Sequence, residues 1–119
     1  MTDSVHSMDS SSLDIANGYI ACGKPEKAAP ILESLEKKAK EYIAWYLSLN
    51  NTYFQNGYID CHREIYSMLS IQDVYQRLGD SDNPKHADYE KKAKKLDNDL
   101  QALYSAFVSK CDNAGIRLQ

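Results

Sequence analysis

An apolar stripe in the last third of this 119-residue sequence constrains the fold more than any other feature. The stripe recurs at intervals of 4, 3, 4, 3 and 4 residues and consists of Tyr89, Ala93, Leu96, Leu100, Leu103 and Phe107. This spacing places all six side chains on one face of an α-helix. It predicts a long helix over about 86–111 with that face buried.

A second apolar stripe lies before a polar loop at 79–84. Its members are Cys61, Ile65, Met68, Leu69, Ile71 or Gln72, Tyr75 and Leu78. The stripe predicts a helix of about six turns that starts after Gly57. Because the loop is short, we expect the two long helices to pack antiparallel in coiled-coil fashion.

Shorter helices are predicted upstream. The first ends at Gly23, and Pro25 suits the first turn of the next. A third helix is predicted over about 42–56, with Gly57 as its stop signal. The apolar pattern alone also allows one continuous helix over about 25–54. We therefore predict an all-α chain of about five helices, in which no segment has the pattern of a strand.

Two segments that lie 34 residues apart can be overlaid, which pairs Tyr19 with Tyr53 and Gly23 with Gly57. Over about residues 10–75 this pattern resembles the tetratricopeptide repeat, in which each repeat is a pair of antiparallel helices joined by a turn. The residues that match the family's pattern in the first copy are Ala16, Tyr19, Gly23 and Ala28, whereas the second copy departs at Asn50 and His62. The resemblance implies a right-handed helical array with an additional turn within 38–41.

A second resemblance concerns the order of the pieces. The run LDIANGYIACGKPEKAAPILESL, EYIAWYLSL and CHREIYSMLSIQDVYQRLG, followed by a polar loop and a long helix, is similar to the C-terminal soluble region of a family of bacterial multi-pass membrane proteins. The membrane part of that family resembles protein O-mannosyltransferases. The resemblance implies no catalytic residue in this chain, because the family's chemistry is assigned to its membrane-embedded part.

Composition narrows the function classes. A net charge of -3, from 14 Lys and Arg against 17 Asp and Glu, gives no electrostatic reason to expect a nucleic-acid or membrane-surface partner. Three cysteines at unrelated spacings do not form a disulfide framework. No signal peptide or membrane-spanning run is evident. We expect a chain that is soluble by itself, with a disordered segment at 1–11, one helical domain at 12–112 and a tail at 113–119.

Candidate chemical sites are weak. Asp60, Cys61, His62 and Glu64 gather metal-ligand types, but neighbouring positions on a helix diverge in direction and no second cluster completes a set of four ligands. The same divergence argues against a catalytic Cys-His pair. The lysine runs are interleaved with carboxylates, so they predict solvated faces with local ion pairs. We expect no metal, no cofactor and no enzymatic activity.

Aromatic residues concentrate around 45–58, and we predict that Trp45, Tyr46 and Tyr53 are wedged between helices as core. The repeat register also places two asparagines 34 residues apart, at positions that face the concave groove in tetratricopeptide domains. It predicts a neutral partner-binding groove made of Asn17, Ile20, Ala21, Asn51, Phe54 and Gln55. Such a groove would suit a helix or an extended peptide.

These observations predict a non-catalytic protein-interaction or docking domain. The expected partner is a protein or peptide, either the membrane part of a parent protein or a second copy of the chain, and we expect neither nucleic acid nor direct insertion into a membrane. In a parent protein the domain would be membrane-associated and face the periplasm or the cytoplasm. The alternative is a free-standing small helical adaptor or chaperone.

Overall fold

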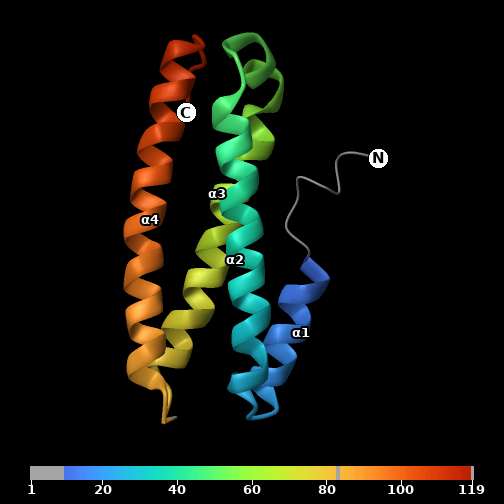
Figure 1. Cartoon of the computed structure of the whole chain (residues 1–119), viewed down its shortest axis with the longest axis vertical. Helices are drawn as coiled ribbons and strands as arrows, with labels where there is room; N and C mark the ends of the chain where they lie inside the picture. Colours follow the sequence, from blue (N-terminus) through green and yellow to red (C-terminus); the bar gives the residue numbers. More distant parts are fainter. Residues whose placement is uncertain (1–9, 83, 119) are drawn as a thin grey trace.

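The computed structural model of the chain describes residues 10–82 and 84–118, and its regular structure there is entirely helical (Figure 1). The elements are α1 (Ser10–Ala21), α2 (Pro25–Ser48), α3 (Asn51–Asp80) and α4 (His86–Asn113). Successive helices run in opposite directions, and α1 and α4 lie on opposite sides of the pair formed by α2 and α3. The prediction of an all-α fold is confirmed.

The α1–α2 turn forms where the sequence predicts it. Gly23 has a φ of 75°, the left-handed conformation that glycine adopts without steric cost. The backbone N–H of Lys24 donates to the carbonyl of Tyr19 at 2.8 Å, and Gly23 N–H donates to Ile20 at 3.0 Å. These bonds satisfy the last carbonyls of α1, and Pro25 then opens α2 at a position where its missing N–H costs nothing.

The prediction of five helices is wrong, because the described residues form four. No turn interrupts α2 within 38–41, where a run of strong helix formers continues and Ala39 is buried. Gly57 lies inside α3 and does not have a positive φ. A Cβ atom at Gly57 would lie 3.2 Å from the ring of Tyr46, so this glycine permits close packing instead of ending a helix.

The connection between α2 and α3 lies at Leu49 and Asn50. The side-chain Oδ1 of Asn50 accepts a hydrogen bond from the backbone N–H of Tyr53 at 3.0 Å, as an N-cap residue does. The backbone N–H of Leu49 donates to the carbonyl of Tyr46 at 3.2 Å and closes α2. The capping asparagine is therefore the local signal for the boundary between α2 and α3. The apolar pattern gives no such signal, because it continues across this boundary.

The two predicted stripes of the C-terminal hairpin meet in the core. Of the α4 stripe all members are buried except the half-buried Leu103, and α3 buries most of its own stripe while Leu69 stays exposed. The two helices are antiparallel, as predicted, although α3 extends through Asp80 into the segment predicted as loop. At this end the backbones approach closely: a Cβ atom at Gly79 would lie 2.7 Å from Cγ of Glu90 and 3.1 Å from its backbone nitrogen.

The aromatic residues around 45–58 are only partly core. Tyr46 is buried, whereas Trp45 is 45% exposed and Tyr53 is 64% exposed. Trp45 lies in the last turn of α2 and meets Tyr46 edge to face, with ring centroids 5.0 Å apart. The core prediction is therefore right for Tyr46 and wrong for Trp45 and Tyr53.

The end of the chain is tied to the beginning of α3. Nε2 of Gln55 donates to the carbonyl of Ala114 at 2.6 Å, and Nδ2 of Asn51 donates to the carbonyl of Asn113 at 3.2 Å. Ala114 itself is buried. Of the segment predicted to be disordered, residues 1–9 lie outside the described residues, while Ser10 and Ser11 open α1.

Candidate functional site

The residues of the predicted groove do not come together. Asn17, Ile20 and Ala21 lie near the end of α1, where α2 begins, whereas the other three lie near the start of α3, where α2 ends. Between the two groups runs an uninterrupted α2 of 24 residues, which is about 36 Å long. The prediction of one groove is wrong because the overlay assumed a turn within α2 that would have brought the two first helices side by side.

The individual residues have structural partners instead. Phe54 is 0% exposed and its ring meets that of Phe107 edge to face at 6.0 Å. Ile20 is half-buried against the core, and Oδ1 of Asn17 accepts a hydrogen bond from Nη2 of Arg77 at 3.4 Å. Asn51 and Gln55 bind the end of the chain, as described above.

A different surface gathers exposed rings, on the outer side of α3 and α4. Its floor is Phe107, which is fully buried. The ring of His62 lies 5.6 Å from Phe107 and 6.4 Å from Tyr66, onto which it stacks. The ring of Tyr104 lies 6.2 Å from Phe107 on the α4 side. Tyr66 is 66% exposed and Tyr104 is 45% exposed.

A shallow cavity of about 390 Å³ between α1 and α3 extends this surface. Leu13 lines it from α1, and Tyr66 and Leu69 line it from α3. Tyr66 thus borders both the ring cluster and the cavity. We call the surface made of Leu13, His62, Tyr66, Leu69 and Tyr104 the aromatic face.

The aromatic face was not predicted from the sequence, although the positions of its members in the helical pattern were known. Leu69 belonged to the predicted core stripe, and Tyr66 and Tyr104 fell outside both stripes. Residues outside the apolar stripe of a helix are expected to be exposed, so the positions of Tyr66 and Tyr104 along their helices already predicted that both rings are exposed. The sequence could not predict that these rings lie close together, because that depends on how α3 and α4 are aligned.

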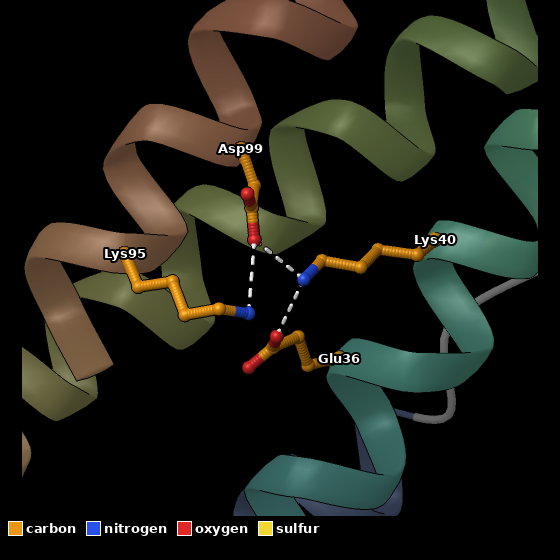
Figure 2. Close-up of polar contacts among 4 residues, drawn as sticks. All are labelled: Glu36, Lys40, Lys95 and Asp99. Atoms are coloured by element: carbon orange, nitrogen blue, oxygen red, sulfur yellow. Dashed lines mark hydrogen bonds and ion pairs between the residues drawn. The ribbon is translucent and has the colours of Figure 1, made fainter.

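Charged side chains join α2 to α4 along a polar seam (Figure 2). Nζ of Lys40 donates to Oε2 of Glu36 and to Oδ2 of Asp99, each at 2.7 Å, and Nζ of Lys95 lies 3.7 Å from the same oxygen of Asp99. A further ion pair links Lys92 of α4 to Glu33 of α2.

These contacts shift two pKa values in opposite directions. The hydrogen bond from Lys40 lowers the pKa of Asp99 from its ordinary value of 3.8, and this effect exceeds that of burial. Burial opposes the charged form of Lys40, but its hydrogen bonds to Asp99 and Glu36 outweigh burial and raise its pKa. Both side chains are therefore charged at neutral pH.

The residues around Cys61 lie in different environments. Cys61 and Glu64 are buried, whereas His62 is exposed on the aromatic face. Burial, with the nearby Cys111 and Glu64 adding to it, raises the pKa of Cys61 to about 12, so its sulfur is a thiol and not a nucleophilic thiolate at neutral pH. Across the described part of the chain, no three His, Cys, Asp or Glu side chains are grouped so that they could hold a metal ion.

Two findings bear on the chain as a whole. Among the helices of the described ranges, none is both long and apolar enough to cross a membrane. Searches against models of protein families, against curated proteins and against solved structures found no match to this chain.

Proposed function

We propose that this chain is a non-catalytic docking domain that binds a protein surface through the aromatic face. The observation that carries this proposal is a series of ring contacts that runs from Tyr66 to His62, from His62 to the buried Phe107, and from Phe107 to Tyr104. Tyrosine and histidine both present an apolar body with a polar tip, and tyrosine is enriched at protein interfaces. Clustered exposed rings on one side of a small domain are characteristic of interaction sites.

The charges beside the aromatic face favour a partner of low net charge. Nε of Arg77 lies 3.2 Å from Oδ2 of Asp73, and Nη1 of Arg63 lies 3.1 Å from Oδ1 of Asp60. In these two pairs each charge is matched by an opposite one on the same helix. Recognition would then depend on ring contacts and on hydrogen bonds from the tyrosine hydroxyls. The partner in this proposal is either the membrane part of a parent protein or a second copy.

We also propose that α1 and the first half of α2 are a single tetratricopeptide-like helical hairpin. Support comes from the fully buried Ala16 and Ala28, which let the two helices approach, and from the left-handed Gly23 between them. The longer α3–α4 hairpin then takes the place of a second repeat and covers the other side of α2.

A pair of photo-crosslinking variants tests the docking proposal. Tyr66 and Tyr53 lie on the same helix and are 66% and 64% exposed, but only Tyr66 belongs to the aromatic face. With p-benzoylphenylalanine at position 66 or at position 53, we expect crosslinks to a protein partner, or to a second copy of the purified chain, from position 66 only. Replacing Tyr104 by Ser should weaken the position-66 crosslinks without changing the helical content measured by circular dichroism.

Equal crosslinking from both positions would contradict the proposal, because it would show that the partner contacts the chain at random and does not prefer the aromatic face. Crosslinking from position 53 alone would assign the interaction to the end of the molecule where α2 meets α3. The purified chain should also be compared by light scattering with and without the Tyr66→Ser change, which separates self-association from binding to another protein.

A further inference from the structure

The dipeptide Asn-Gly occurs twice in the chain, at Asn17-Gly18 and at Asn56-Gly57, and no other asparagine is followed by glycine. Asparagine loses its side-chain amide most readily in this dipeptide, because glycine has no side chain to hinder attack by its backbone nitrogen. Both pairs lie inside helices, the first in α1 and the second in α3. The chain therefore holds the same reactive pair in two different structural environments.

Loss of the amide requires the helix to open locally. In an α-helix the backbone N–H of the glycine donates to the carbonyl four residues earlier, and helical dihedral angles keep its nitrogen away from Cγ of the preceding asparagine. The rate in the folded protein is then proportional to the fraction of time during which that part of the helix is open. The pair in the less stable helix should react first.

Few contacts hold α1 closed around the first pair. Ala16 is the only buried residue among residues 11–21, and nothing lies within 4 Å of a Cβ atom at Gly18. Oδ1 of Asn17 accepts its hydrogen bond from Arg77, an exposed side chain, at 3.4 Å. Because α1 has 12 residues and buries little apolar surface, its opening exposes little that was packed.

The second pair lies in a tightly packed part of α3, a helix of 30 residues. The fully buried side chains of Phe54 and Cys61 flank it along the helix. A Cβ atom at Gly57 would lie 3.2 Å from the ring of Tyr46 in α2. Opening α3 here would expose buried side chains and break its contact with α2, so it costs more free energy than opening α1.

We propose that Asn17 is a site of spontaneous deamidation in the native protein and that the fold protects Asn56. The backbone nitrogen of Gly18 attacks Cγ of Asn17, its proton and the side-chain amino group leave as ammonia, and a five-membered cyclic imide forms. Water then adds to one of the two imide carbonyls and breaks its bond to the shared nitrogen. The product is aspartate, or isoaspartate in which the main chain runs through the former side chain.

The product carries a negative charge that the amide lacks. Asn17 lines the cavity between α1 and α3 together with Tyr66 and Arg77. An aspartate at this position can pair with Arg77 and stay in α1, whereas isoaspartate adds a backbone atom and breaks the hydrogen-bond register of the helix. The reaction itself does not depend on the proposed docking function.

The two pairs provide a test in which each is the control for the other. The purified chain is incubated in mildly alkaline buffer, in water enriched in the heavy oxygen isotope, and mass spectrometry follows the peptides that contain Asn17 and Asn56. We expect Asn17 to convert at least about tenfold faster than Asn56, which corresponds to about 1.4 kcal/mol in opening free energy. In denaturant both should convert at similar rates.

The variant Gly18→Ala tests the route through the cyclic imide. It should slow conversion at Asn17, because alanine hinders the attack and favours the helix, and leave conversion at Asn56 unchanged. Equal native rates at Asn17 and Asn56 would overturn the proposal, since both pairs would then open only with the whole bundle. Faster conversion at Asn56 would overturn it as well, as would an Asn17 amide that persists in native buffer while both pairs convert in denaturant.

Discussion

Helix α4 packs against its two neighbours in different ways. Its contact with α3 is long and apolar, with stripes that interlock from Tyr89 to Cys111. Its contact with α2 consists of ion pairs between charged side chains. Buried apolar area stabilises a fold by roughly 25 cal/mol per Å², whereas an exposed ion pair contributes about 0–1 kcal/mol. We infer that the α3–α4 interface stabilises the fold and that the polar seam mainly sets the position of α2 relative to α4.

The largest effect should come from emptying the apolar interface. Phe107 is fully buried between Phe54, His62 and Tyr104, so Phe107→Ala should destabilise the protein by about 3–5 kcal/mol. Chemical denaturation measures this change. Tyr104→Ala is the control from the exposed side of the same helix, and a comparable loss there would contradict the division between interior and surface.

Thiol labelling measures how tightly the same interface is closed. Cys22 is exposed near the α1–α2 turn, whereas Cys61 and Cys111 are buried in α3 and α4. Because burial raises the pKa of Cys61 to about 12, its thiolate fraction at neutral pH should be about a thousandfold below that of an ordinary cysteine. We expect one fast and two slow thiols with a disulfide reagent, and three fast ones in denaturant. Three fast thiols without denaturant would show that α3 and α4 separate readily.

Two glycines give a test in which the sign of the effect differs. A Cβ atom at Gly79 would lie 2.7 Å from Glu90, whereas nothing lies within 4 Å of a Cβ atom at Gly18 in α1. Gly79→Ala should therefore destabilise by about 1–3 kcal/mol through overpacking. Gly18→Ala should stabilise by about 0.5–1 kcal/mol, because alanine is the better helix former. Thermal unfolding of both variants would show whether the helices approach more closely at Gly79 in the α3–α4 interface than at Gly18 in α1.

The smallest effect is expected at the polar seam. Asp99 has a lowered pKa, so its ionised form stabilises the fold. This contribution is complete above the unfolded-state pKa near 4 and is lost as the pH falls through the lower pKa of the folded state. Asp99→Asn should cost at most about 1 kcal/mol at pH 7, since the side chain is about one-third exposed and screened by solvent.

The pH dependence of the destabilisation by Asp99→Asn shows whether it results from the lost charge or from the altered shape of the side chain. The difference in unfolding free energy between Asp99→Asn and the wild type should shrink below about pH 4, and also at high salt. A difference of several kcal/mol at pH 7 would instead place the polar seam among the main stabilising contacts and remove the contrast between the two interfaces of α4.

The C-terminal hairpin could be predicted because its signals are local. The spacing of Tyr89 to Phe107 and the polar loop at 79–84 fix two helices and their antiparallel order without knowledge of anything distant. The α2–α3 boundary was missed because the overlay gave weight to Gly57, whereas Asn50 carries the cap. At Gly57 the reason for glycine is the ring of Tyr46, eleven positions earlier, and contacts of that kind do not appear in helical periodicity.

The candidate sites depended still more on tertiary structure. The phase of Tyr66 and Tyr104 on their helices indicates exposure, but only the alignment of α3 with α4 brings the rings of His62 and Tyr104 to the same Phe107. The two Asn-Gly pairs can be read from the sequence. Which of them lies in a tightly packed helix depends on the neighbouring helices and could not be predicted from the sequence.

The position of Trp45 has a consequence for spectroscopy. It is the chain's single tryptophan and lies in the last turn of α2, beside the connection to α3, so selectively excited emission reports on that pole of the molecule. Fraying of α1 near Gly23, or of α3 near Asp80, would leave this emission almost unchanged while circular dichroism lost amplitude. Coincident melting curves from the two signals would therefore demonstrate that the whole bundle unfolds as one cooperative unit.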